Sequence, residues 1–272
     1  PSPAIAAAQR KPEPAIAPQT SDALHPFNQE DFALAYGALL AGKDSARAFQ
    51  VAQKAVQQVP QDRQWRRRLA QAAEWTQRPL VAAQQWRTLF DTGDHSPEIV
   101  SAVIRLAYYM DDPAIVLKAW QARDKQTVLT AVQWQDVYSL YESAAQPSQG
   151  SLFFEQQFKQ KKTLKMLEYA AQLAENAGED ERATALYLQR AGLEPFSLDM
   201  VLRAAVALIR QDRMRDALEL MHRHQAQVPA DAAEFWGLLG QVAWEQGAFE
   251  SAQGAYQNLV KRPLTAADDW SR

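Results

Sequence analysis

Apolar residues recur at helical spacing along most of the chain, in pairs of segments separated by short polar breaks. Within residues 164–197, the first segment contains Leu167, Ala170, Ala171 and Ala174. Their spacing of i, i+3, i+4 and i+7 places them on one face of a helix. Gly178 follows, where glycine commonly ends a helix. A second apolar segment from Ala183 to Ala191 precedes Pro195, through which a helix does not continue. The pattern predicts two helices joined by a short turn.

This paired pattern repeats. Pro195, Pro229 and Pro263 are 34 residues apart. Mostly small residues recur with the same step at Ala48, Ala82, Val116, Gly150, Ala183, Ala217 and Ser251, except for one interval of 33 residues at 131–163. Bulky residues recur four positions later, at Trp86, Trp120, Phe154, Tyr187 and Met221. These columns predict seven units, at about residues 29–62, 63–96, 97–130, 131–163, 164–197, 198–231 and 232–265.

The columns also predict how the units pack. A helical hairpin of this size cannot bury both of its faces, so neighbouring units must stack. A small residue at a helix crossing allows close approach, and the bulky residue one turn later fills the space beside it. We therefore expect Trp86 and Trp120 in the core. The predicted fold class is all-α, a solenoid of stacked helix-turn-helix repeats.

The seventh unit carries a recognisable motif. It reads Trp236-Gly237-Leu238-Leu239-Gly240, followed by Gly247, Ala252, Tyr256 and Leu259. This motif and the 34-residue period resemble the tetratricopeptide-repeat (TPR) family. The resemblance implies a right-handed superhelical solenoid that acts as a protein–protein interaction scaffold. Trp270 lies 34 residues after Trp236, so residues 266–272 are expected to open an eighth repeat that is cut off, as in a piece of a longer protein.

The N-terminal residues 1–26 differ from the repeats. They contain Pro1, Pro3, Pro12, Pro14, Pro18 and Pro26 among Ala, Gln and Ser. Proline removes the amide donor that a helix needs, so this segment is expected to be a disordered linker or a tether to something upstream, such as a membrane anchor. The chain has no run of 18 apolar residues, so no membrane span is expected within it.

Composition narrows the chemistry. The chain has no Cys, which excludes disulfides and thiolate chemistry. The net charge of −3 argues against a nucleic-acid partner. Phosphate-binding and catalytic motifs are missing from the sequence. His222 and His224 point to different faces of a helix, so they do not predict a metal site. We expect no catalytic residue, no cofactor and no metal, and hence no enzyme.

The surface expected to bind a partner is the inner face of the first helices. Its positions recur near the second, fifth, ninth and twelfth residue of each unit. The candidate groove residues are Arg67, Gln71, Arg105, Tyr108, Gln135, Glu168, Gln172, Leu202, Arg210 and Trp244. Arginine and aromatic side chains commonly anchor interfaces. The dense run Arg63, Arg66, Arg67 and Arg68 is either a patch for an acidic partner or a helix face paired with neighbouring acidic residues.

A finer resemblance concerns export systems. The Pro/Ala/Gln-rich start, the lack of Cys and the divergent, Gln- and Trp-rich repeats are similar to the periplasmic repeat region of Pel-type (PelB-like) exopolysaccharide exporters of the outer membrane. This resemblance implies a periplasmic protein that docks a polysaccharide deacetylase or hydrolase and guides polymer to an outer-membrane pore, within a membrane-associated full-length protein. Two alternatives stay open: a cytoplasmic adaptor for another complex, and a groove that binds exopolysaccharide directly.

Overall fold

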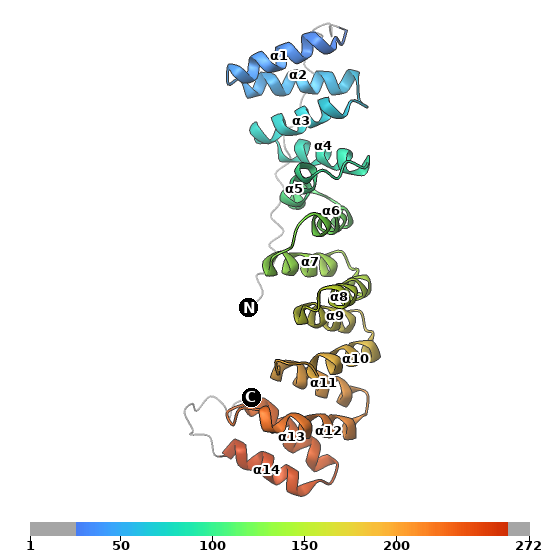
Figure 1. Cartoon of the computed structure of the whole chain (residues 1–272), viewed down its shortest axis with the longest axis vertical. Helices are drawn as coiled ribbons and strands as arrows, with labels where there is room; N and C mark the ends of the chain where they lie inside the picture. The colour runs from blue at the N-terminus through green and yellow to red at the C-terminus, as the bar shows by residue number, and fades with distance from the viewer. Residues whose placement is uncertain (1–25, 261–272) are drawn as a thin grey trace. The chain divides into compact units, whose positions relative to one another are not determined.

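The computed structural model describes residues 26–260. Within this range the chain forms fourteen α-helices and two short 3-10 helices, with no strand (Figure 1). Of the expected linker at residues 1–26, only Pro26 falls in the described range, and the expected start of an eighth repeat at residues 266–272 lies outside it. The predicted fold class, an all-α solenoid of repeats, is confirmed.

The helices come in pairs. The first helices are α1 (Gln29–Ala41), α3 (Arg63–Trp75), α5 (Pro97–Arg105), α7 (Ala131–Ser143), α9 (Leu164–Asn176), α11 (Leu198–Arg210) and α13 (Ala233–Glu245). The second helices are α2 (Ser45–Gln58), α4 (Pro79–Asp91), α6 (Pro113–Gln126), α8 (Pro147–Lys161), α10 (Asp180–Ala191), α12 (Met214–His224) and α14 (Phe249–Val260). The short 3-10 helices are η1 (Ala107–Tyr109) and η2 (Gln225–Gln227).

Helix starts and turns follow local chemistry. Three second helices, α4, α6 and α8, begin with a proline, which suits the first helical position because its missing N–H has no intrahelical partner there. The turn inside a pair needs a left-handed residue, and Gly178 (φ 72°) and Gly247 (φ 74°) supply it after α9 and α13. The corresponding turns after α3 and α7 use Gln77 and Ala145 at positive φ instead. The turn therefore keeps its backbone shape without always keeping glycine.

The third pair departs from this scheme. Helix α5 ends at Arg105, and the chain continues in η1 with bonds from Tyr109 N to Leu106 O (2.8 Å) and Met110 N to Ala107 O (3.0 Å). These bonds tighten the last turn into a 3-10 helix. As a result, Tyr108 lies on η1 rather than on an α-helix, and its side chain is 80% exposed.

The chain divides into two compact units, with the boundary between Ile115 and Val116 inside α6. In the first unit each helix from α1 to α5 contacts the next. Trp65 is fully buried at its centre, where the rings of Phe27, Phe32 and Tyr36 meet it edge-on at centroid distances of 6.1, 6.1 and 5.9 Å. Edge-to-face pairs of this kind add stability beyond the area that they bury.

In the second unit, consecutive helices from α7 to α14 also contact one another. Aromatic rings fill the space between α7, α8 and α9, where Phe154 packs against Trp134, Tyr141 and Tyr169. The later helices pack through buried alanines, including Ala171 and Ala205. Within this unit, α8, α10 and α12 each contact their own first helix and the next one.

The small-residue column lies where the sequence places it. Its first six members are buried, and Ser251 is half-buried. Trp86 and Trp120 are also buried, at 1% and 6% exposure, so the prediction that both belong to the core is confirmed. Gly150 shows why the column is small, because a Cβ atom there would lie 2.6 Å from Cγ of Tyr141 and 2.9 Å from Cδ1 of Leu173.

We predict that Gly150→Ala lowers the free energy of unfolding by about 1–3 kcal/mol, because the buried Tyr141 side chain cannot move away from the added methyl group. Gly237→Ala is the matched control, since nothing lies within 4 Å of a Cβ atom at that helical position. It should raise stability by about 0.5–1 kcal/mol through reduced backbone entropy of the unfolded chain. Urea denaturation of both variants tests this pair, and equal effects would contradict the packing argument.

Candidate functional site

Glutamates recur at the C-terminal end of the first helices. Glu74, Glu142 and Glu175 occupy the twelfth position of their predicted repeats, on the last turns of α3, α7 and α9. Each accepts hydrogen bonds from an aromatic side chain and from a donor on the next first helix. We call each such set a rung.

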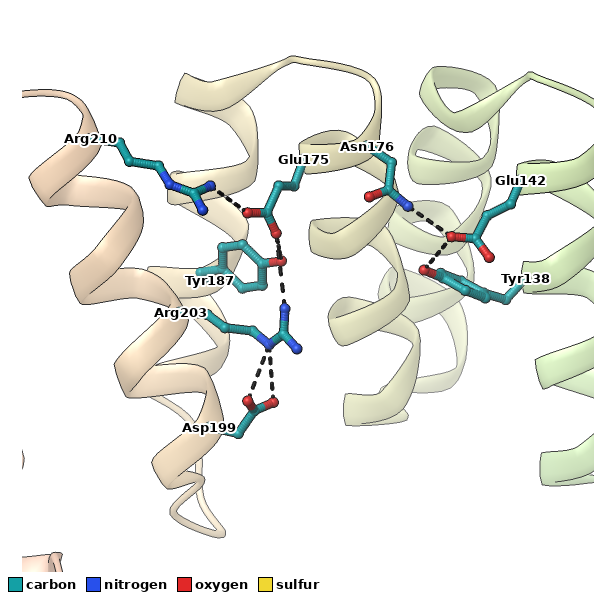
Figure 2. A network of polar contacts seen from close by, with 8 residues as sticks. All are labelled: Tyr138, Glu142, Glu175, Asn176, Tyr187, Asp199, Arg203 and Arg210. Carbon is teal, nitrogen blue, oxygen red and sulfur yellow. Dashed lines mark hydrogen bonds and ion pairs between the residues drawn. The ribbon is translucent and has the colours of Figure 1, made fainter. Parts of the chain in front are cut away.

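The rung at Glu175 is the most extensive (Figure 2). The hydroxyl of Tyr187 on α10 donates to Oε2 of Glu175 at 2.6 Å, and Nη1 of Arg210 on α11 donates to Oε1 at 2.8 Å. Arg203 lies against the Tyr187 hydroxyl, and its Nε bonds both carboxylate oxygens of Asp199 at 3.2 Å. Three consecutive helices are therefore tied together by one carboxylate and its donors.

The rung at Glu142 joins α7 to α9. The Tyr138 hydroxyl donates to Oε1 of Glu142 at 2.9 Å, and Nδ2 of Asn176 donates to the same oxygen at 2.8 Å (Figure 2). Beside it, the Tyr138 ring stacks on that of Tyr169 at a centroid distance of 4.9 Å. The Tyr169 hydroxyl in turn donates to Oε1 of Gln135 at 2.7 Å.

The first unit contains the third rung. Nε1 of Trp86 donates to Oε1 of Glu74 at 2.6 Å, and Nη2 of Arg105 bonds Oε1 and Oε2 at 2.8 and 2.6 Å. A second polar link lies beside it, in which Gln71 donates to Glu98 at 2.8 Å. Arg67 pairs with Asp94 at 3.0 Å and with Glu98 at 3.4 Å. These contacts connect α3 to the start of α5.

The rungs change the acidity of their groups. Burial, followed by the hydrogen bond to Glu142 and its charge, raises the pKa of Tyr138 to about 12. Burial and Glu175 raise the pKa of Tyr187 in the same way. Asp94 shows the opposite balance: burial favours a higher pKa, but hydrogen bonds from Ser96 and the charges of Arg67 and Arg63 outweigh it and lower the pKa.

The structure brings several candidate groove residues together. Arg67, Gln71 and Arg105 belong to the contacts between α3 and α5, whereas Gln135 and Arg210 take part in the contacts of the second unit. The remaining candidates vary in accessibility. Tyr108 and Trp244 are largely exposed, and Gln172 is half-buried.

Two candidates serve the packing of the second unit instead. Leu202 is 9% exposed, so it is not part of an accessible groove, because its face of α11 packs into the core. Glu168 pairs with the buried Arg190 at 3.0 Å. Arg190 also donates to the carbonyl oxygens of Leu193 and Pro195 at 3.2 Å each. Glu168 thereby stabilises the loop that leads into α11, in addition to an exposed pair with Lys165 at 3.0 Å.

The arginine run on α3 is engaged by its own chain. Arg63 donates to Thr92 O at 2.9 Å and Arg66 to Gln85 Oε1 at 2.8 Å. Arg68 lies 4.5 Å above the centroid of the Trp65 ring. Together with the ion pairs of Arg67, these contacts favour the paired helix face over a free patch for an acidic partner.

Sequence reasoning missed the partners of the rungs. Glu74, Glu142 and Glu175 are twelfth residues of their units and so belong to the expected inner face, but the sequence pattern did not connect them to Trp86, Tyr138 or Tyr187. A signal exists, because Glu74 and Trp86, like Glu175 and Tyr187, are 12 residues apart. Tyr138 precedes Glu142 by four residues instead, so the same bond is made from within one helix and the spacing alone does not reveal it.

Residues 26–260 contain no cluster of three or more His, Asp or Glu side chains that could hold a metal ion. His222 contacts the Ser251 hydroxyl at 2.6 Å, and His224 contacts Gln227 at 3.2 Å. Among the described helices, none combines the length and apolar character needed to cross a membrane.

The helix pairs of this chain are similar to those of known repeat proteins. Residues 196–272, which include α11 to α14, match the family model described as Tetratricopeptide repeat. The similarity to this family is thus carried by the C-terminal part of the chain. A chain in the structure of Naa15/Naa10 bound to HypK-THB is similar over 88% of this chain, with 12% identity and a TM-score of 0.55.

The chain spans only 37% of the length of that structural relative, and the likeness concerns the fold. A tetratricopeptide repeat protein from Parabacteroides merdae aligns over 88% of this chain and 94% of its own, with 11% identity and a TM-score of 0.36. No curated protein matches the sequence.

We predict that Glu175→Ala lowers the free energy of unfolding by about 1–3 kcal/mol, because the buried Tyr187 hydroxyl then loses its acceptor. Glu175→Gln keeps an acceptor oxygen and should cost less. Arg210→Ala is the control, since an exposed ion pair contributes about 0.2–1 kcal/mol. Chemical denaturation measures all three, and an equal loss in Arg210→Ala would show that the ion pair, not the tyrosine bond, stabilises the rung.

The raised pKa of Tyr138 predicts that the free energy of unfolding depends on pH in the alkaline range. Its pKa is about 12 in the folded chain, against 10.0 for an ordinary tyrosine. The unfolded chain therefore loses this proton first, and the associated stability, complete below pH 10, is lost as pH rises towards 12. In Tyr138→Phe, unfolding free energy should fall less steeply between pH 10 and 12 than in the wild type. Tyr108→Phe, on an exposed ring, should keep the wild-type slope.

Proposed function

We propose that this chain is a tetratricopeptide-repeat scaffold for protein–protein interaction without catalytic activity, and that the Glu175 rung forms part of its docking face. The observation that carries the proposal is the fixed position of two accessible guanidinium groups. Arg210 is 62% exposed while Glu175 holds it, and Arg203 is 42% exposed while Asp199 holds it (Figure 2). Side chains already ordered before binding lose less entropy on association.

Arginine suits this role chemically. Its planar guanidinium donates several hydrogen bonds in a fixed geometry, and arginine is enriched among the residues that dominate binding energy. The two arginines and the two carboxylates that hold them sum to zero charge. The expected partner surface therefore accepts directed hydrogen bonds through carbonyl or carboxylate oxygens. It does not need a high net charge of its own, because the docking face is neutral overall.

The finer proposal follows the resemblance in the sequence. We propose that the scaffold belongs to a Pel-type exopolysaccharide export complex, where it docks a periplasmic polysaccharide deacetylase or hydrolase and guides polymer to an outer-membrane pore. The Pro/Ala/Gln-rich start, the lack of Cys and the Gln- and Trp-rich repeats support this proposal. A second candidate function, direct contact with the polysaccharide, is favoured by the exposed indoles of Trp75 and Trp244, because flat rings can stack on sugar faces.

Affinity capture tests the scaffold proposal. The immobilised chain, exposed to periplasmic extract of a bacterium that secretes a Pel-type exopolysaccharide, is expected to retain a polysaccharide deacetylase or hydrolase identified by mass spectrometry. The double variant Arg203→Glu/Arg210→Glu should reduce the retained enzyme about tenfold or more, because it removes two anchoring donors at the docking face.

The matched control is Arg213→Glu/Arg223→Glu, which changes the same charge on exposed arginines of α12. It should retain the enzyme as the wild type does. Equal loss in both double variants would point to net charge instead of the docking face. Retention of cytoplasmic proteins only, with no such enzyme, would favour the adaptor alternative.

A further inference from the structure

The first unit has a surface hollow next to its Glu74 rung. It lies beside the ends of α3 and α5 and has a volume of about 510 Å³. Glu74, Trp75, Glu98 and Arg105 are among the side chains that line it. Beyond Arg105 lies a second hollow of about 460 Å³, lined by the apolar side chains of Pro79 and Leu106 and by Tyr109. Glu74 and Arg105 line both hollows and so separate them.

The charge of the first hollow is negative. Its lining has two carboxylates, Glu74 and Glu98, and one guanidinium, Arg105, which leaves one negative charge. Adding the neighbouring pair of Arg67 and Asp94 does not change that sum. Glu74 is held by Trp86 and Arg105, and its side chain is 24% exposed. Glu98 accepts a hydrogen bond from Gln71 at 2.8 Å and pairs with Arg67 at 3.4 Å, but its side chain is 46% exposed. Glu98 is therefore the carboxylate that an incoming cation can reach.

Trp75 lines the same hollow as Glu98 and adds an exposed aromatic ring to it. It lies at the last residue of α3, and its side chain is 53% exposed. Elsewhere in residues 26–260, cations lie over the rings of Phe49, Trp65 and Trp134 at 4.4–4.5 Å, but no such contact is found at Trp75. An exposed indole that lines the same hollow as a carboxylate is a favourable setting for an ammonium or guanidinium group, because the ring face attracts cations.

We propose that this hollow binds a lysine or arginine side chain of a partner protein, with the cation between the Trp75 ring and the Glu98 carboxylate. The inference rests on the proposed scaffold function and names the partner chemistry for the first unit. The second hollow takes an apolar side chain of the same segment. Arg105 holds Glu74 through Nη2, and its other N–H groups donate to a backbone carbonyl of the segment between the two side chains.

The pair of unlike hollows favours a peptide segment as the occupant. The hollows share Glu74 and Arg105, but the first adds Glu98 and Trp75 whereas the second adds Gln77 and the apolar Pro79 and Leu106. The occupant must therefore present different groups to each. A protein segment does this through neighbouring side chains, whereas a polymer of one amino sugar presents the same cationic group at every step. A protein is also the partner class that the repeat fold implies.

An NMR titration of the whole chain tests the proposal. The probe is an end-blocked pentapeptide with lysine at its second and leucine at its fourth position, and the readout is the indole N–H signal of Trp75, assigned from its loss in Trp75→Ala. The signal should shift saturably. Affinity should fall about fivefold or more in Trp75→Ala and Glu98→Gln, and with acetyl-lysine in the probe, because each change removes part of the cation site.

Trp244→Ala is the matched control, because it removes an exposed tryptophan of the second unit, and it should bind the probe like the wild type. For variants that lack the Trp75 signal, affinity is read from the Trp86 indole signal. The absence of a saturable shift in the wild type, or unchanged affinity in both hollow variants, would overturn the proposal. Tighter binding of a glucosamine oligomer than of the peptide would assign the hollow to an amino sugar and overturn the protein segment as its occupant.

These outcomes are separable from those of the scaffold proposal. Enzyme capture through Arg203 and Arg210 with no peptide binding would overturn the hollow alone. Peptide binding that depends on Trp75, without any captured enzyme, would support the hollow and overturn the proposed docking face.

Discussion

The close approach of the paired helices in most repeats is the constraint on which the other features depend. It requires a small residue at the crossing, and at Gly150 even a methyl group would meet the buried side chains of Tyr141 and Leu173. Ala82 and Ala183 occupy the same column in other repeats and are buried. Because dense cores do not yield easily to added volume, this column sets how far apart the helices of each pair lie.

Helix spacing in turn places the polar rungs. An aromatic side chain on a second helix reaches back to a glutamate on its own first helix, as Tyr187 does to Glu175 and Trp86 to Glu74. The same glutamate accepts a donor from the following first helix. One carboxylate thus satisfies a buried hydroxyl or indole N–H and fixes an accessible arginine. Stability and the proposed docking face are coupled at the rungs, since both depend on the same hydrogen bonds.

The two units present different chemistry on this common frame. In the second unit, arginines held by carboxylates project as directed hydrogen-bond donors. In the first unit, the shortened α5 and the 3-10 turn η1 leave Tyr108 exposed near the end of the helix pair, and the exposed Trp75 borders an acidic hollow. A scaffold with unlike faces can distinguish partners that a uniform groove would bind equally well.

The sequence by itself determined the helix pairs, their period and the residues that pack between them. These features depend on local spacing and on residue size, which a single chain displays directly, as the burial of Trp86 and Trp120 shows. Only the tertiary structure decided which inner-face residues are accessible. Leu202 is buried and Glu168 holds Arg190, because neighbouring helices cover positions that share a face in sequence. The bond between Asn176 and Glu142 was also decided by the tertiary structure. The two residues are 34 positions apart, and only the stacking of α9 on its neighbours brings them together.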